Sequence, residues 1–341
     1  MTNDAPRHRR ALPTLAVLAL LATPALADPP NPTLGTIERK DARFDRLIPK
    51  DAVIEQLAKG FIWAEGPVWI PKGDYLLFSD TRQNTVFQWS ESGGVRSFLK
   101  PSGYTGQAPR DGEPGSNGLM LDLAGNLVLC QHGDRRIARL EEGGRFTTLV
   151  DRYMGKRLNS PNDGVYKSNG DLYFTDPSYG LLKLNDDPAK ELPFNGVYRL
   201  AKSGELTLLT KDLTFPNGLA FSPDEKTLYI ANSDPNRAVW TAYPVLDNGL
   251  VGPGKIFADV TALTKTKKGL PDGLKVDKDG NIFAAGPGGI LVFAPDGTHL
   301  GTLDTGVPTG NSAWGDDGGT LYITAESSLC RVKTSTKGPG F

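Results

Sequence analysis

The sequence predicts an all-β fold, a six-bladed β-propeller with four-stranded antiparallel blades. Three observations favour it: a phrase that recurs six times, a surplus of turn residues, and no convincing helical period longer than a turn or two. The 341 residues include 40 Gly and 26 Pro, which is typical of many short strands joined by turns. With 38% hydrophobic residues, a chain of this length can bury a sizeable core.

The recurring phrase is a short turn with Asn, Asp or Glu, usually followed by Gly, an apolar pair, a second turn and an apolar strand. Successive copies lie 39 to 55 residues apart, with further strand-like runs between them. A unit of this length with about four short strands is typical of a propeller blade, whereas stacked α/β repeats would need a helical period in each unit. The copies begin at Glu65, Asn117, Asn162, Asn217, Asp272 and Asn311.

Closure of the ring is predicted to involve both ends of the domain. The copy that begins at Asn311 leaves only about 30 residues, enough for three strands. The N-terminal run from Ala52 to Phe61 can supply the missing strand of this C-terminal blade, which removes the free sheet edges. The predicted propeller domain therefore covers residues 51–341, and residues 28–50 form a lead-in segment.

The N-terminus predicts a signal peptide at residues 1–27. Basic residues at positions 7–10 precede an apolar run from Leu12 to Leu21, and Ala25-Leu26-Ala27 has the small residues of a cleavage site. The run is too short for a transmembrane helix, and no comparable stretch occurs later. We expect cleavage after Ala27 and a periplasmic or secreted protein, with an uncleaved N-terminal anchor as the alternative.

Charge and composition exclude several classes of function. Without residues 1–27 the chain has 35 Lys and Arg against 38 Asp and Glu, a balance that predicts no nucleic-acid partner and no binding to an anionic membrane. Three His and two Cys leave little for imidazole or thiolate chemistry. Cys130 and Cys330 each lie in an apolar strand-like run, which favours buried free thiols over a disulfide.

A binding site is expected on the propeller axis. The first strand of a blade is the innermost, so the residues at the start of all six copies gather on one face as two carboxylates and four carboxamides. Carboxylates brought together need a balancing cation. Hard oxygen donors suit one divalent cation, with Ca²⁺ favoured and Mg²⁺ or Zn²⁺ as alternatives. Each Asn-Gly or Asp-Gly taken alone is better explained as a turn, but Glu65 is followed by Gly66-Pro67, a poor turn signature that still falls in register.

The same face should receive the ends of the second strands and the loops that follow them. Among the residues there, His132 is the favoured candidate for a substrate contact, because His8 lies in the signal segment and His299 in a turn between later strands. For any one of these residues alone, a turn or capping role is favoured over a substrate contact. The other residues at the ends of second strands or in the loops that follow are Asp176, Ser178, Tyr179, Asn232, Asp234 and Glu326. The loops 101–116 and 260–270 are expected on the same face.

Four motifs resemble those of the senescence-marker/gluconolactonase/luciferin-regenerating family of six-bladed propellers. In order they are Ala64-Glu-Gly-Pro-Val-Trp69, Asn159-Ser-Pro-Asn-Asp-Gly164 with Phe174-Thr-Asp-Pro177, Phe215-Pro-Asn-Gly-Leu-Ala-Phe-Ser-Pro-Asp224 and Pro271-Asp-Gly-Leu274. The resemblance runs from about Phe61 to Val332. The Asn159–Asp163 form is similar to the bacterial gluconolactonase branch.

The resemblance implies a metal-dependent hydrolase of sugar lactones, such as glucono-1,5-lactone. It implies Glu65, Asn217 and Asp272 as metal ligands, with Asn162 completing the set or contacting substrate, and Asp272 as general base. The expected catalytic residues are therefore Asp272 and Glu65, and the expected substrate contacts are Asn117, His132, Asn162 and Asp163. A bound cation can polarise the lactone carbonyl and activate water. Asp163 is the second candidate for the base, because adjacent side chains on a strand diverge.

Two other functions stay open at this point. The same metal site could serve a lactonase or phosphotriesterase of broader specificity, although the polar loops around the mouth favour a polyhydroxylated ligand. A propeller that binds a ligand without catalysis is the other, and Glu65 and Asp272 in register argue against it. A Ser-His-Asp triad is disfavoured, because the sequence has no Gly-x-Ser-x-Gly turn.

Overall fold

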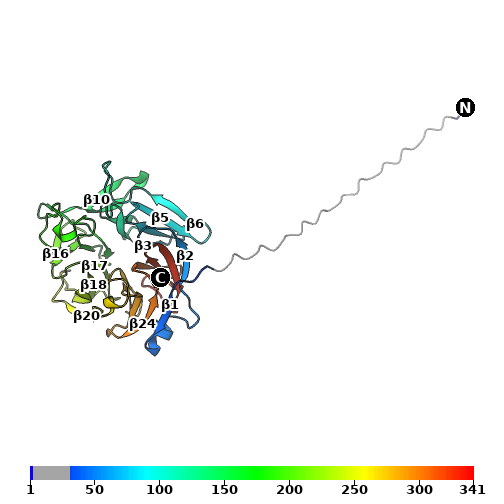
Figure 1. The fold of residues 1–341 in the computed structure, drawn as a ribbon. Coiled ribbons are helices and arrows are strands. Elements are labelled where there is room, and N and C mark those ends of the chain that lie inside the picture. The colour runs from blue at the N-terminus through cyan, green and yellow to red at the C-terminus, as the bar shows by residue number, and fades with distance from the viewer. Residues whose placement is uncertain (3–30) are drawn as a thin grey trace. The chain divides into compact units, whose positions relative to one another are not determined.

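A computed structural model describes residues 1–2 and 31–341, and the predicted signal peptide falls almost wholly outside these residues. Residues 31–341 form a ring of six antiparallel sheets (Figure 1), so the predicted six-bladed propeller is confirmed. The first strands of neighbouring blades contact one another around the axis. In Figure 1, β3 and β17 lie toward the centre of the ring, and β6, β10, β16 and β20 lie at its rim.

The blades follow one another along the chain. Blade one contains β3 (Ala64–Ile70), β4 (Tyr75–Asp80), β5 (Thr85–Ser90) and β6 (Gly94–Leu99). Blade two contains β7 (Ser116–Leu121), β8 (Leu127–Gln131), β9 (Arg136–Leu140) and β10 (Phe146–Val150). Blade three contains β13 (Gly164–Tyr166), β14 (Leu172–Asp176), β15 (Gly196–Leu200) and β16 (Leu206–Thr210). A hairpin of β11 (Arg152–Tyr153) and β12 (Lys156–Arg157) lies between blades two and three.

The second half of the ring repeats this pattern. Blade four contains β17 (Pro216–Phe221), β18 (Thr227–Asp234), β19 (Arg237–Pro244) and β20 (Lys255–Asp259). Blade five contains β21 (Leu274–Val276), β22 (Ile282–Gly286), β23 (Gly289–Phe293) and β24 (His299–Asp304). Blade six contains β25 (Thr309–Gly315), β26 (Thr320–Ala325) and β27 (Ser328–Lys333).

Short 3₁₀ helices are the helical segments of residues 31–341. They are η1 (Ala42–Arg46), η2 (Glu142–Gly144), η3 (Leu184–Asp186) and η4 (Leu263–Lys265). Within the described residues, none of the helices has the length and apolar character that a membrane span requires.

The ring closes where the sequence predicts. Strand β2 (Glu55–Lys59) pairs antiparallel with β27, so that Glu55 lies opposite Arg331 and Lys59 opposite Ser328. Blade six thereby gains its outer strand from the N-terminal side of the domain. Because the strand comes from a distant part of the chain, the two ends of the propeller are held in one sheet.

Part of the lead-in segment packs into the propeller, which the sequence does not predict. Strand β1 (Thr36–Arg39) pairs with β24 and gives blade five a fifth strand. The helix η1 that follows buries Phe44 in a cluster with Ile48 and Leu303. The four residues of β1 have no buried side chain and Ile37 as their one large apolar residue, so the segment shows no apolar alternation.

Apolar side chains fill the spaces between the blades. Trp69 of blade one stacks on Tyr322 of blade six with ring centroids 5.5 Å apart, and Phe283 of blade five meets Trp314 of blade six edge to face at 4.9 Å. Cys130 and Cys330 are both buried and free, as the sequence favours. Packing between blades therefore depends on aromatic contacts rather than on a covalent bond between these two residues.

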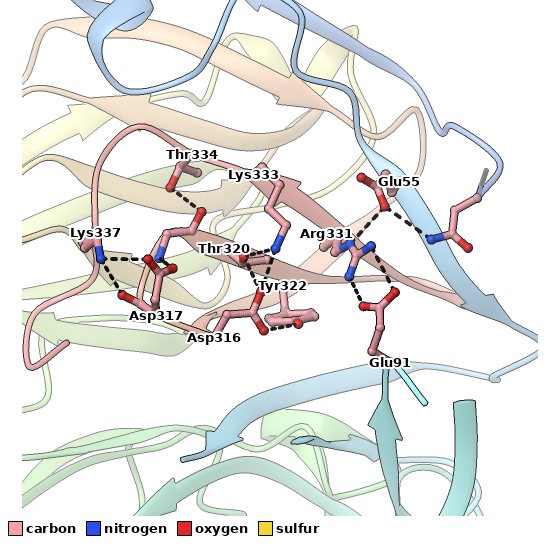
Figure 2. A network of polar contacts seen from close by, with 12 residues as sticks. Glu55, Glu91, Asp316, Asp317, Thr320, Tyr322, Arg331, Lys333, Thr334 and Lys337 are labelled. Carbon is pink, nitrogen blue, oxygen red and sulfur yellow. Dashed lines mark hydrogen bonds and ion pairs between the residues drawn. The ribbon is translucent and has the colours of Figure 1, made fainter. Parts of the chain in front are cut away.

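A polar network covers the seam where the ring closes (Figure 2). The Arg331 guanidinium of β27 donates to Glu55 of β2 at 2.9 Å and also to Glu91 of the turn after β5. Its side chain is 12% exposed and lies over the Trp89 ring. Arg331 thus joins blade one, blade six and the closing strand.

We expect Arg331→Met to lower the free energy of unfolding by about 1–3 kcal/mol, because it leaves the half-buried Glu55 carboxylate without its partner. Urea unfolding measures this loss. Lys337→Met is the matched control, since Lys337 pairs with Asp317 at the exposed surface and should contribute less than about 1 kcal/mol. Equal effects of the two substitutions would show that Arg331 has no special part in closure.

Candidate active site

One cavity of about 400 Å³ lies on the axis, on the face where the inner strands begin. Five of the six residues that start the repeated phrase line it. They are Glu65, Asn117, Asn162, Asn217 and Asp272. The sequence predicts that all six meet at one place, and the structure brings five of them, from five different blades, to this cavity.

The backbone at each of these positions departs from a regular strand. The pairing register shifts just where Glu65, Asn117 and Asn217 lie, between Glu65 and Val68, Ser116 and Leu119, and Pro216 and Leu219. Asn162 and Asp272 lie just before the first residues of β13 and β21. A bulge at the start of an inner strand turns a side chain out of the sheet and toward the axis.

The glycine of the recurring phrase does more than form a turn, because it contacts the inner strand of the neighbouring blade. Gly118 donates its N–H to the carbonyl of Asn162 in the next blade at 2.7 Å, and Gly273 donates to Gly310 at 2.8 Å. A Cβ on Gly273 would overlap the Asn311 amide. Glycine is required because the inner strands of neighbouring blades approach too closely for a side chain.

Side chains at the ends of second strands anchor the backbone just before the cavity residues. Each accepts a hydrogen bond from an N–H two or three positions before Glu65, Asn162 or Asn217. The three contacts are Asp80 Oδ2 with the N–H of Ile62 (2.7 Å), Asp176 Oδ1 with that of Ser160 (2.8 Å) and Asn232 Oδ1 with that of Phe215 (2.9 Å). Asp176 and Asn232, which the sequence places at the mouth, are fully buried in this anchoring role.

The cavity is strongly acidic. Burial raises the pKa of Glu65 to about 8, although its carboxylate accepts hydrogen bonds from Trp63 Nε1 and the N–H of Gly66, both at 3.1 Å. Burial and the nearby Glu65 charge raise the pKa of Asp272 well above its usual value. The residues that line the cavity include no Lys, Arg or His. Two carboxylates without a basic neighbour are stable as charged groups only when a cation joins them.

The donors at the cavity fit a hard cation. Asn217 Oδ1 is buried and has no hydrogen-bond partner among the described residues, so its lone pairs are available. A Cβ on Gly310 would overlap the Glu65 carboxylate, so this glycine makes the space that the carboxylate occupies. Carboxylate and amide oxygens are ligands that Ca²⁺ accepts. No group of three or more His, Cys, Asp and Glu suited to a metal occurs in residues 31–341, so any site here must include the amides.

Two of the predicted residues are buried outside the cavity lining. Asp163 is 3% exposed, does not line the cavity, and accepts a hydrogen bond from Asn311 Nδ2 at 3.1 Å. Asn311 Oδ1 in turn accepts one from Lys275 Nζ at 3.2 Å. Asp163 diverges from Asn162 because adjacent residues of an extended segment point in opposite directions. The structure therefore does not bring Asp163 or Asn311 to the cavity.

His132 is also not brought to the cavity. Its side chain is completely buried, and it is absent from the lining. The ring Nδ1 lies 3.2 Å from Oε2 of Glu113, which does line the cavity. His132 thus lies behind the cavity lining and contacts Glu113, which lines the cavity.

Several lining residues are not singled out by the sequence. Glu113 lies in the loop 101–116, and its only signal is an acidic side chain four residues before Asn117. Trp63, Phe215 and Leu270 form apolar parts of the wall, and Ser233 adds a hydroxyl. Tyr179, which the sequence places at this mouth, lines the cavity and stacks on Phe215 with centroids 5.5 Å apart.

Fold and site together define a six-bladed propeller with an acidic, amide-lined cavity on its axis. Residues 63–327 match the model of the SMP-30/Gluconolactonase/LRE-like region. The chain therefore belongs to this family, and the resemblance inferred from its motifs is confirmed.

Three individual proteins illustrate the similarity. A gluconolactonase of Zymomonas mobilis is 42% identical over 90% of this chain and 88% of its own. A solved structure of a gluconolactonase from Xanthomonas campestris is 32% identical in sequence, has a TM-score of 0.77, and aligns with 90% of this chain and 99% of its own. A lactonohydrolase of Aspergillus oryzae is 27% identical over 80% of this chain and 68% of its own.

The buried carboxylates predict an unusual dependence of stability on pH. The folded protein keeps protons on Glu65 and Asp272 that the unfolded chain releases above about pH 4.5. In chelator-treated protein the free energy of unfolding should therefore fall as pH rises from about 5 to 8, by up to about 1.4 kcal/mol per pH unit for each group. Thermal unfolding at several pH values measures this slope.

Glu65→Gln is the control for this experiment, since it removes one titrating group and should reduce the slope. Added Ca²⁺ should restore stability most at high pH, where the carboxylates are free to bind it. A slope that is the same in wild-type protein and Glu65→Gln would contradict the assignment.

Proposed function

We propose that this protein is a lactonase that hydrolyses sugar lactones, with the conversion of glucono-1,5-lactone to gluconate as the representative reaction. The observation that carries the proposal is the convergence of the buried Glu65 carboxylate, the partly buried Asp272 carboxylate and three carboxamides in one cavity that has no basic side chain. The 42% identity to a gluconolactonase over most of both chains supports the choice of substrate class.

We infer that Glu65, Asn162, Asn217 and Asp272 hold one divalent cation, with Ca²⁺ favoured by the oxygen donors. Such a cation polarises a bound carbonyl and lowers the pKa of water. Asn217 contributes its unpartnered Oδ1, and Glu65 is held in place by Trp63 and the N–H of Gly66. Asn117 lines the same cavity and can donate its amide hydrogens to substrate oxygens.

The carboxylate of Asp272 is the candidate general base. It faces the cavity, where burial and the nearby Glu65 charge raise its pKa above the usual range. It would take a proton from the attacking water and return it to the alkoxide that leaves when the ring opens. Asp163 is less suited, because its carboxylate is already engaged by Asn311 and lies outside the cavity.

The remaining wall selects and shields the substrate. Phe215, Leu270 and Pro308 give an apolar surface for the C–H face of a sugar ring. Excluding water at this wall strengthens the electrostatic interactions at the carboxylates. The polar groups and the apolar wall together fit a small ring that carries several hydroxyl groups.

Removing the cation should abolish activity. We expect chelator-treated protein to lose acid release from glucono-1,5-lactone and Ca²⁺ to restore it, and we expect Glu65→Gln or Asp272→Asn to lower kcat/KM by roughly 100-fold or more. Calorimetric titration should show weaker Ca²⁺ binding by both variants. Glu326→Gln is the control, since Glu326 is not part of the lining, and it should stay within about twofold of wild type.

Activity that is indifferent to chelation and to both substitutions would overturn the metal-dependent mechanism. Faster turnover of an organophosphate triester than of any lactone would favour the broader phosphotriesterase. No turnover of any ester, with retained ligand binding, would favour a binding propeller without catalysis.

We also propose that the protein is exported and cleaved after Ala27. The support is the order of basic, apolar and small residues at positions 7–27. N-terminal sequencing of protein from the periplasmic or culture fraction should begin at Asp28. Protein that retains Met1 in the cell pellet would contradict export.

A further inference from the structure

Glu113 is the third acidic side chain of the cavity and has no role in the proposed metal site. It is 21% exposed, whereas Glu65 is almost completely buried. Burial is the main cause of the raised pKa values of Glu65 and Asp272, and the Glu113 charge adds a smaller contribution to both. Glu113 therefore lies at the rim, close to the buried carboxylates and in partial contact with water.

The loop that carries Glu113 is fixed to the propeller at both ends. At its start, Asn84 Oδ1 accepts the N–H groups of Ser102, Gly103 and Tyr104 at 2.8 to 3.2 Å. At its end, the N–H of Gly115 donates to Thr81 at 2.7 Å. Between these points Arg110 donates to the carbonyl of Gly180 in blade three at 2.9 Å. These bonds give the Glu113 backbone a defined place above the cavity.

His132 contacts the Glu113 side chain from the side that faces away from the cavity. Its Nδ1 lies 3.2 Å from Glu113 Oε2, but neither ring nitrogen makes a hydrogen bond of regular geometry among the described residues. The close packing of Gly180, where a Cβ would lie 2.8 Å from His132 Cβ, leaves the histidine backbone no room to move toward blade three. The approach of Nδ1 to Glu113 is therefore the polar contact of the buried imidazole within residues 31–341, and a small rotation of the Glu113 carboxylate would make it a hydrogen bond.

A carboxylate held in this way suits the recognition of hydroxyl groups. It is an acceptor with two oxygens, and two neighbouring hydroxyls of a sugar ring can each donate to it. The wall also contains the apolar side chains Phe215, Leu270 and Pro308, which offer no hydrogen bonds. A ring without hydroxyls would gain nothing from Glu113.

We propose that Glu113 is a specificity-determining residue that accepts hydrogen bonds from the ring hydroxyls of the lactone, and that His132 is the positioning residue that holds its carboxylate. The inference rests on the proposed lactone hydrolysis and adds how the site distinguishes a lactone with ring hydroxyls from one without them. His132 acts through Glu113 and does not touch the substrate.

The test compares glucono-1,5-lactone with δ-valerolactone, which has the same ring without hydroxyls. Glu113→Met keeps the length of the side chain and removes its oxygens. We expect it to raise KM for glucono-1,5-lactone by about tenfold or more with kcat within about threefold, and to leave δ-valerolactone unchanged. Asp111→Asn is the matched control, since it removes an exposed charge from the same loop without touching the cavity.

His132 is tested with two substitutions. His132→Leu should reproduce the selective rise in KM for glucono-1,5-lactone, and His132→Asn should restore most of the wild-type value, because its amide can donate to Glu113 from about the place of Nδ1. The melting temperature of each variant separates a loss of folding from a loss of positioning. A general structural defect would affect both lactones alike.

Equal loss of kcat on both lactones would overturn the inference and place Glu113 in the chemistry. Unchanged parameters for both would also overturn it.

Calorimetric binding of gluconate to wild type and Glu113→Met separates this inference from the proposed hydrolysis. Wild type that binds gluconate without opening any lactone would refute the hydrolysis, while weaker binding by Glu113→Met would still support the inference. Wild type that neither binds gluconate nor opens a lactone would refute both.

Discussion

The pairing of β2 with β27 is the constraint on which the rest of this structure depends. Only a closed ring brings the first strands of six blades around one axis, and only then do side chains more than 200 residues apart in sequence, such as Glu65 and Asp272, share a cavity. Arg331 and the stacked pair Trp69 and Tyr322 stabilise the same seam. Closure therefore serves stability and chemistry through one set of contacts.

The acidic groups that the function requires in the cavity lower the stability of the fold. Burying Glu65 and Asp272 without a basic neighbour opposes folding whenever both are charged. Apolar packing between blades and the anchoring bonds of Asp80 and Asp176 offset that cost. The outcome is a set of oxygen donors held in place before any ligand arrives, which is what binding a cation and orienting a small ring require.

Much of the fold and part of the site follow from repetition. Five of six phrase positions reach the cavity because a repeat that forms one blade places equivalent residues at equivalent points of the ring. The exceptions have local causes. Asn311 is engaged by Asp163 and Lys275 outside the cavity lining, and β1 lacks the alternation that would have revealed it. Glu113 and His132 lie in or beside irregular segments, where no period assigns a direction to a side chain.

The sequence by itself determined the propeller, the number of blades, the closing strand and five of the residues that line the axial cavity, because each depends on a local pattern that recurs at a regular spacing. The tertiary structure alone decided which polar groups face the cavity and which face one another. Asp163 pairs with Asn311 outside the cavity lining, and His132 lies behind Glu113 rather than beside the ligand. Such pairings depend on how loops from different blades pack in three dimensions, and no pattern along the chain encodes that distance.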